Sequence, residues 1–194
     1  NPTTRDTLSL HDALPILPGE FLTIIGRSGC GKTTALKLVN GLITPDAGRV
    51  LVHGEDVAKT DPVALRRRIG YAIQSVGLFP HMTVEKNIAY VPTISHLEGW
   101  KGPARRERES ALLRQVGLDP ALADRYPRAL SGGQRQRVGI ARALAAGPEI
   151  LLMDEPFGAV DEITRGQLQE EILRIHRESG ITILFVTHDI ARSE

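Results

Sequence analysis

Short apolar runs alternate along the chain with longer stretches in which apolar positions recur at helical spacing. The short runs predict strands at 21–25, 49–52, 69–73, 149–154 and 182–186. Three of these runs are continuously apolar, which is typical of strands buried on both faces of a parallel sheet. The longer stretches predict helices at 32–41, 83–90, 104–116, 133–146 and 162–178. This alternation indicates an α/β fold with a mostly parallel sheet.

The pattern changes between about residues 76 and 146, where helical spacing continues but no convincing strand occurs. We therefore expect a helical subdomain at 76–146, inserted into an α/β core made of residues 17–75 and 147–191. The last predicted helix carries its apolar residues on one face, at i, i+4 and i+7: Leu168, Ile172 and Ile175.

Composition narrows the function classes. The 194 residues, 41% of them hydrophobic and 24% charged, fit one domain or one domain with a sizeable insertion. A formal charge of +1 provides no global field for nucleic acid or for an anionic membrane. The single cysteine, Cys30, cannot form an internal disulfide, which favours a reducing compartment. No apolar run approaches the ~20 residues that span a bilayer, so a membrane role has to come through a partner.

A glycine-rich stretch, GRSGCGKT at 26–33, satisfies the pattern G-x-x-x-x-G-K-[ST] directly after a predicted strand and at the start of a predicted helix. Backbone N–H groups of such a loop, together with the positive end of the helix, surround phosphate oxygens. Lys32 would reach the β- and γ-phosphates, and the Thr33 hydroxyl can ligate Mg²⁺. Three glycines let the main chain bend and approach closely: Gly26, Gly29 and Gly31. The context favours a phosphate loop over a simple glycine-rich turn.

Two adjacent carboxylates end the apolar stretch ILLMDEP at 150–156. Asp154 would hold Mg²⁺ directly or indirectly, and Glu155 would polarise an attacking water. Alone, such a pair could equally be a solvated strand end. The phosphate loop in the same chain favours a shared phosphoryl-transfer site.

A third motif, LSGGQRQR at 130–137, opens a predicted helix. Ser131 is a natural N-cap, and Gly132 and Gly133 expose backbone N–H groups at a positive helix end. The motif therefore predicts a second anion site.

The order of GRSGCGKTT, the Gln74 segment, LSGGQ, ILLMDEP, GAVD and VTHD closely resembles the nucleotide-binding ATPase subunit of ATP-binding cassette (ABC) transporters, over residues 17–191. The resemblance implies a P-loop NTPase core with ATP and Mg²⁺ as cofactors. Two subunits are expected to sandwich two ATP molecules, each phosphate loop facing the partner's LSGGQ. It further implies permease subunits in the membrane as partners, a solute-binding protein as an indirect partner, and a peripheral position on the cytoplasmic face of the inner membrane.

The resemblance also assigns roles. Glu155 resembles the catalytic base, His188 the residue that contacts the γ-phosphate, and Gln74 the residue that couples Mg²⁺ and water to the helical subdomain. Asp161 resembles the aspartate that communicates between the two sites, although GAVD stands where the family usually has SALD. The expected nucleotide contacts are Gly26, Ser28, Gly29, Cys30, Gly31, Lys32, Thr33, Thr34, Ser131, Gly132, Gly133, Gln134 and Asp161. The expected metal ligands are Thr33, Gln74 and Asp154.

The transported solute is predicted from two segments, 70–92 and GW at 99–100. They look most like the corresponding segments in importers of osmoprotectants such as glycine betaine, choline or carnitine. Amino-acid and polyamine importers share much of this segment and stay an alternative. A non-transport ABC protein is a further alternative, but the chain between Lys32 and Ser131 contains no heptad run for a long coiled coil. A small-molecule P-loop kinase would have no use for LSGGQ followed by ILLMDEP.

The two ends carry a different signal. LSLHDALPI at 8–16 matches a translation of a common sequencing adapter, CTT TCC CTA CAC GAC GCT CTT CCG ATC, and residues 192–194 match AGA TCG GAA from its reverse complement. Residues 1–16 and 192–194 are therefore expected to be non-native. On this interpretation the family's N-terminal antiparallel strands and C-terminal helices are truncated, which would expose a sheet edge and weaken ATP binding and hydrolysis.

Overall fold

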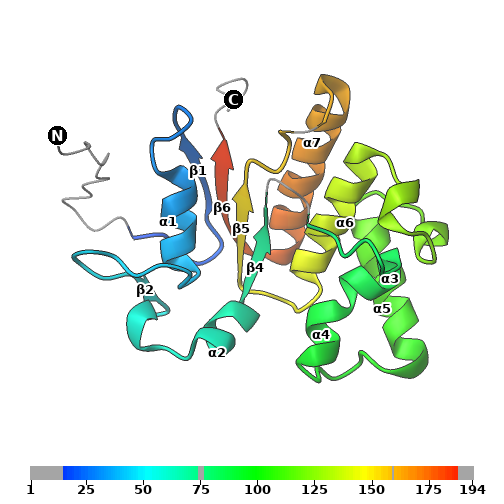
Figure 1. Cartoon of the computed structure of the whole chain (residues 1–194), viewed down its shortest axis with the longest axis horizontal. Coiled ribbons are helices and arrows are strands. Elements are labelled where there is room, and N and C mark those ends of the chain that lie inside the picture. The colour runs from blue at the N-terminus through cyan, green and yellow to red at the C-terminus, as the bar shows by residue number, and fades with distance from the viewer. Residues whose placement is uncertain (1–14, 74–76, 159, 188–194) are drawn as a thin grey trace.

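A four-stranded parallel sheet forms the centre of the protein in a computed structural model that describes residues 15–73, 77–158 and 160–187. The strand order is β1-β6-β5-β4, and all three strand pairs are parallel. The strands are β1 (Phe21–Ile25), β4 (Ile69–Ala72), β5 (Ile150–Asp154) and β6 (Thr182–Thr187). The predicted α/β fold with a mostly parallel sheet is confirmed (Figure 1).

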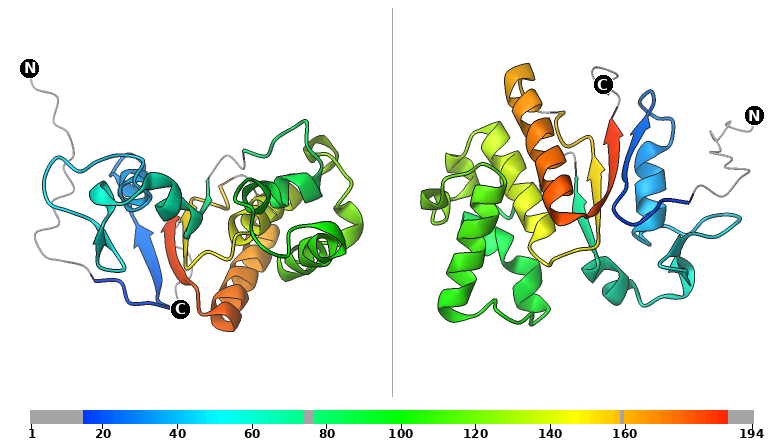
Figure 2. Two further views of the ribbon diagram at one scale, coloured as in Figure 1. Left: turned by 90° about the horizontal axis from the view of Figure 1, so that it is seen from below. Right: turned by 180° about the vertical axis from the view of Figure 1, so that it is seen from behind.

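Helices cover both faces of this sheet, with α1 (Lys32–Val39) on one side and α6 (Gly132–Leu144) and α7 (Glu162–Ser179) on the other (Figures 1 and 2). Successive side chains of a strand point to opposite faces. In β5, Leu151 and Met153 therefore join the core on the α6 and α7 side, and Leu152 joins the smaller core under α1. Burial on both sides explains why the strand sequences are continuously apolar.

The predicted face of α7 is confirmed, because Leu168, Ile172 and Ile175 are all buried against the sheet. The helix begins at an N-cap, Asp161, and ends at Gly180, which adopts the left-handed φ of 65° that terminates helices. These two residues bound a helix whose Arg165 and Gln169 line a small cavity together with Phe185 and Thr187 of β6.

Residues 77–146, all of them described, contain helices and turns but no strand. The stretch comprises α3 (Val84–Ile88), α4 (Tyr90–Ile94), α5 (Gly102–Gln115) and α6, with short 3₁₀ turns at Pro120–Leu122 and Pro127–Ala129. Asn87 is fully buried there, accepts the Phe79 N–H at 2.8 Å and donates to nearby carbonyls. Helix α6 also packs on β4, so the helical stretch is in direct contact with the sheet.

Three regions of the chain differ from the predictions. The strand expected at 49–52 is only β2 (Leu51–Val52), and it pairs antiparallel with β3 (Glu55–Asp56) outside the parallel sheet. Helix α2 (Pro62–Arg67) was not predicted, although Asp61 caps its first turn by accepting from the N–H groups of Val63 and Ala64. The helix expected at 83–90 is divided into α3 and α4.

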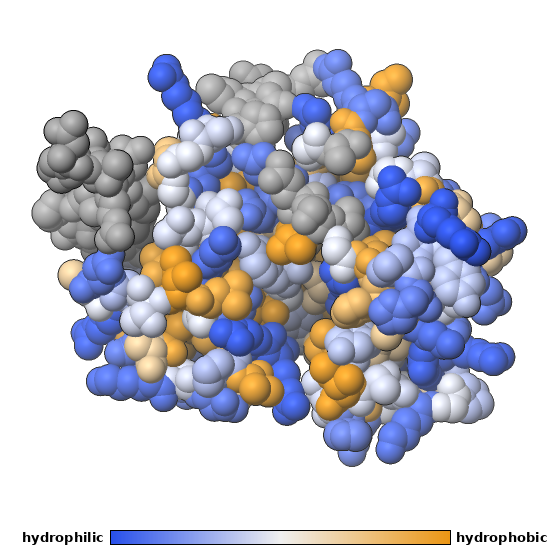
Figure 3. Space-filling model, viewed as in Figure 1, coloured by the Kyte–Doolittle hydropathy of each residue, from blue (hydrophilic) through white to orange (hydrophobic). Residues whose placement is uncertain are grey.

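The face shown in Figure 3 has a central hollow with apolar surface on either side. Several large apolar side chains are exposed: Leu17, Ile25, Leu42, Ile43, Leu51, Val63, Ile94, Tyr126, Ile163 and Leu173. None of the described helices is long and apolar enough to cross a membrane.

The expectations for the chain ends fall mostly outside the described residues. Of residues 1–16, only Pro15 and Ile16 are described; Pro15 is exposed, and Ile16 packs against the core under α1. Residues 192–194 are not among those described. In the described sheet, β1 is an edge strand.

Candidate active site

The phosphate loop leaves β1 and turns into α1 through residues that only glycine accommodates easily. Gly29 and Gly31 have φ values of 84° and 97°, in the left-handed region. A Cβ on Gly26 would come within 2.7 Å of the Cys30 Sγ, so the thiol packs closely on the loop backbone. Helix α1 has no side-chain cap, and Ser28 and Thr34 beside its start are exposed. Its first N–H groups are therefore left for an acceptor from outside the helix.

Lys32 is only 5% exposed, and its ammonium lies within this loop. The Nζ donates to the carbonyl oxygens of Gly26 at 2.6 Å and Arg27 at 3.0 Å. Among the described residues, no carboxylate forms an ion pair with it. The Nζ also lies 3.9 Å from the Cys30 Sγ. A nearly buried cation whose partners among the described residues are neutral is well suited to an anionic ligand.

Thr33 connects the loop to the end of β5. Its Oγ1 donates to Asp154 Oδ1 at 3.0 Å, across 121 positions of sequence. Asp154 is 7% exposed. It lies two residues after Leu152 on the same strand, so its side chain is on the same face of the sheet, the α1 side. The structure thus brings Thr33, the neighbour of Lys32, into contact with Asp154 and joins the two motifs.

Tyr71 was missed by the sequence analysis. Its hydroxyl lies 3.5 Å from Asp154 Oδ2, the oxygen that Thr33 does not contact. Burial, and after it the negative charge of Asp154, raise the pKa of Tyr71 to about 12. The signal available in the sequence was a tyrosine near the end of a predicted strand, but strand order and register are needed to place it beside Asp154.

Glu155 occupies a strained turn directly after β5. Its φ is 44°, which is uncommon for a residue with a side chain, and its N–H donates to the Val186 carbonyl at 2.9 Å. The turn moves Glu155 away from the Asp154 side, toward a small cavity of about 60 Å³ that Arg165 and Gln169 of α7 help to line. The two adjacent carboxylates therefore have different surroundings, in keeping with different roles.

The start of α6 has its own internal cap. Ser131 Oγ accepts the Gln134 N–H at 3.2 Å, and Gln134 Oε1 accepts the Ser131 N–H at 2.9 Å, which completes a capping box. A Cβ on Gly133 would approach Thr164 Cγ2 of α7 to 2.8 Å, so this glycine permits a close helix contact. Ser131 was predicted as an N-cap, and this is confirmed. The second use of Gln134, as the other half of the cap, was missed.

Asp161 likewise caps α7. Its Oδ1 accepts the Thr164 N–H at 2.9 Å, and its Oδ2 accepts the Thr164 hydroxyl at 2.7 Å. These hydrogen bonds hold the pKa of the Asp161 carboxyl below its usual value. The residue therefore has a structural task in addition to the communicating role that the resemblance implies.

The predicted site residues divide into two groups in space. The phosphate loop and α1 lie on one side of the sheet, whereas Ser131, Gly132, Gly133 and Gln134 open α6 on the other side (Figure 1). The structure does not bring these groups together within one chain. Gln74 and His188 lie outside the described residues.

The oxygen donors at the site suit Mg²⁺. The Thr33 hydroxyl and the Asp154 carboxylate are hard ligands, and a magnesium ion usually takes only one or two protein ligands beside phosphate and water. Within the described ranges, no group of three or more His, Cys, Asp and Glu side chains could hold a metal alone. A cation that shares its shell with a nucleotide therefore fits these residues better than a metal held by protein alone.

The chain matches the ABC transporter family over residues 11–158. It is 54% identical over 91% of its length to the glycine betaine/carnitine/choline transport ATP-binding protein OpuCA of Bacillus subtilis, of which it covers 46%. It is also 54% identical over 89% of its length to the glycine betaine uptake system ATP-binding protein YehX of Escherichia coli, of which it covers 55%. The chain thus spans about half the length of the curated relatives it matches.

A solved structure of similar fold is a dimeric ATP-binding cassette in a post-hydrolysis state, bound to ADP and Pi. The TM-score is 0.82 at 35% identity, covering 91% of this chain and 78% of the other. The likeness supports the P-loop ATPase fold that the motifs predicted.

Proposed function

The chain belongs to the ABC transporter family, and from that premise we propose that it is the ATP-hydrolysing subunit of an importer. In this proposal it binds ATP with Mg²⁺, hydrolyses ATP in a site shared by two subunits, and drives a permease in the membrane. The observation that carries the proposal is the 3.0 Å hydrogen bond from Thr33 Oγ1 to Asp154 Oδ1. It joins the phosphate loop to the strand end where catalytic carboxylates are expected.

Phosphate binding falls to the loop and to Lys32. The uncapped N–H groups of α1 point their dipoles at an anion, and the Lys32 ammonium is already inside the loop. On binding, Lys32 would exchange the carbonyls of Gly26 and Arg27 for phosphate oxygens. The exchange replaces two neutral acceptors by charged ones, which strengthens its hydrogen bonds.

Thr33 and Asp154 would hold Mg²⁺, which supplies charge neutralisation between the β- and γ-phosphates when bound. Glu155 would act as general base and accept a proton from the attacking water. The strained φ of 44° and the hydrogen bond to Val186 support different roles for Asp154 and Glu155, because they turn Glu155 away from the sheet face on which Asp154 lies.

A second copy of the chain would complete the site. The start of α6 lies across the sheet from the phosphate loop of its own chain, so Ser131, Gly132 and Gly133 would meet the nucleotide held by a partner. The capping box uses the N–H of Gln134 and leaves the amides of the two glycines to an outside acceptor. The dimeric form of the solved cassette supports this arrangement.

The proposed solute is a quaternary-amine osmoprotectant, because the names of several relatives specify glycine betaine, carnitine or choline. The ATPase region alone separates solutes only partly, since a sulfate/thiosulfate import ATP-binding protein of Pseudomonas aeruginosa is 48% identical over 91% of the chain. The partners would be permease subunits and, through them, a solute-binding protein. The chain would lie on the cytoplasmic face of the membrane.

The hydrolysis step is tested with Glu155→Gln. We expect hydrolysis to fall about 10²- to 10⁴-fold while ATP binding stays intact, because the amide keeps the size but cannot accept the proton. The matched control is Glu162→Gln, at an exposed glutamate in the first turn of α7. Phosphate release and binding of a fluorescent ATP analogue are measured side by side. Unchanged turnover in Glu155→Gln would refute the assignment of the base.

The transport step is tested with a chimera in which residues 17–187 replace the matching segment of OpuCA. We expect the chimera to support uptake of labelled glycine betaine in a Bacillus subtilis strain that lacks OpuCA, and the same chimera with Lys32→Ala to fail. The same replacement in the sulfate/thiosulfate protein should support little sulfate uptake. If the two chimeras are equally expressed, sulfate uptake by the second without glycine betaine uptake by the first would refute the proposed solute class.

A further inference from the structure

Each oxygen of the Asp154 carboxylate lies beside a different hydroxyl. Thr33 Oγ1 donates to Oδ1 at 3.0 Å, and Tyr71 Oη lies at 3.5 Å from Oδ2. Resting on the proposed function, we propose that Tyr71 is a positioning residue for the cation site: its hydroxyl holds Oδ2 and thereby turns Oδ1 toward Thr33 and toward a bound Mg²⁺.

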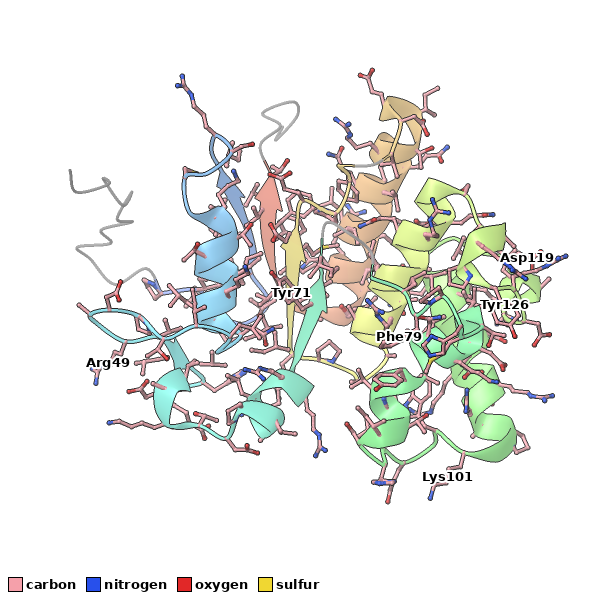
Figure 4. All side chains as sticks on the ribbon, viewed as in Figure 1. Arg49, Tyr71, Phe79, Lys101, Asp119 and Tyr126 are labelled. Carbon is pink, nitrogen blue, oxygen red and sulfur yellow. The ribbon has the colours of Figure 1, made fainter. Side chains whose placement is uncertain are left out.

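The sheet register accounts for the position of this hydroxyl. Tyr71 on β4 is paired with Leu152 on β5, and Asp154 lies two residues further along the same strand. Two residues of strand span ~6.6 Å, and positions two apart lie on the same face. The tyrosine side chain can therefore run along the sheet face that α1 covers and end at the carboxylate. Figure 4 shows Tyr71 on β4, in the middle of the molecule.

Packing keeps the tyrosine ring in place. The ring is half-buried against the core that contains Leu36, Leu65 and Leu152, so it approaches Asp154 from an already ordered position. A hydroxyl on an ordered ring loses little conformational freedom when it makes a hydrogen bond. The exposed hydroxyl of a flexible side chain would not orient a carboxylate in this way.

The Asp154 carboxylate needs this second donor. It is 7% exposed, and the described residues provide it with hydrogen bonds only from Thr33 and Tyr71. A nearly buried carboxylate with one unpaired oxygen is free to rotate toward any other donor. The phenol hydroxyl of a tyrosine is a hydrogen-bond donor at neutral pH, so Tyr71 can supply that donor.

The test compares the affinity for a fluorescent ATP analogue in excess Mg²⁺ with that in EDTA, in protein carrying Glu155→Gln so that the nucleotide persists. The dissociation constant in EDTA divided by that in Mg²⁺ measures how much the cation strengthens nucleotide binding. Tyr71→Phe should lower this ratio about three- to tenfold, as expected for the loss of one hydrogen bond, and leave the affinity in EDTA unchanged.

The matched control is Tyr90→Phe, at a half-buried tyrosine on α4 whose ring packs 4.7 Å from that of Phe79. It should not change the ratio. Thermal unfolding of both variants is measured in parallel. A purely structural Tyr71 would lower the unfolding temperature or both affinities equally, and an unchanged ratio would overturn the proposal for Tyr71 alone. Protein that binds no nucleotide in either condition, although folded, would overturn the proposed function and this inference with it.

Discussion

Two helices of this protein start within glycine-rich sequences, and their first turns are capped differently. Helix α1 begins after Gly31, with φ 97° and no side-chain cap. Helix α6 begins at Ser131, whose side chain and that of Gln134 form a complete capping box. The first start thus depends on an acceptor from outside the helix, whereas the second is already ordered within the chain. An uncapped start beside a buried lysine indicates where a nucleotide is held, and a capped start indicates a preformed surface presented to it.

The largest effect is expected at the uncapped start. Lys32→Ala removes the buried ammonium, so affinity for a fluorescent ATP analogue should fall roughly 10- to 100-fold. Lys37→Ala, at an exposed lysine on the same helix, is the control and should bind normally. Normal binding by Lys32→Ala would remove the distinction between the two starts.

The next effect concerns the packing of the capped start. Gly133→Ala would place a Cβ 2.8 Å from Thr164 Cγ2 and should destabilise the fold by about 1–2 kcal/mol. Thr164→Ser removes that methyl but keeps the hydroxyl that donates to Asp161. The double variant should therefore recover most of the loss in urea unfolding. Additive losses in the double variant would show that the close approach of α6 and α7 is not the cause.

A somewhat smaller effect is expected for the cap itself. Ser131→Ala removes the acceptor of the Gln134 N–H and should cost about 1 kcal/mol in urea unfolding. Ser28→Ala, in the exposed phosphate loop, should cost nothing measurable, because no side chain caps α1. Equal losses at both positions would contradict the contrast between the capped and the uncapped start.

The smallest effect is a pH dependence at the start of α7. Hydrogen bonds from Thr164 lower the folded-state pKa of Asp161, so its carboxylate stabilises the fold above the ordinary aspartate pKa of about 3.9. This contribution is lost as the pH falls below that value and through the folded pKa. Asp161→Asn, which can still cap the helix, should therefore show a flatter loss of stability on acidification. Identical acid unfolding of the two proteins would refute the assignment.

Local patterns were sufficient for the elements that carry the site. The apolar run ending in Asp154 and the glycine pattern before Lys32 each predicted an element that the structure contains. Because parallel strands end at the same edge of a sheet, these patterns also predicted that Asp154 lies near the phosphate loop, as its contact with Thr33 shows. Tyr71 could not be found in this way, since its contact with Asp154 depends on β4 lying next to β5 in one register. Neither the strand order nor that register is encoded in the residues near Tyr71.

The fold was predicted less well where elements are short. Strands β2 and β3 have two residues each, too few to show an alternating pattern, and their antiparallel pairing is a tertiary feature. Helix α2 did have a local signal, Asp61 followed by Pro62 at its first position, which is typical of a helix start. The separation of the phosphate loop from the start of α6 was implied only by the family resemblance, because as local patterns both motifs predict anion sites equally well. The residues at this start, Ser131, Gly132, Gly133 and Gln134, are called the Ser131 group below.

The central claim, that each nucleotide is held by the phosphate loop of one chain and the Ser131 group of another, is tested most directly by mixing two defective variants. In a Glu155→Gln background, Lys32→Ala disables the loop and Ser131→Arg blocks the start of α6, so neither variant alone should retain ATP in a dimer. Mixed, they should form a dimer with one intact site and about half the ATP retained by the parent, measured by light scattering and bound nucleotide. A mixture that retains no more ATP than its separate components, while the parent forms dimers, would contradict the claim.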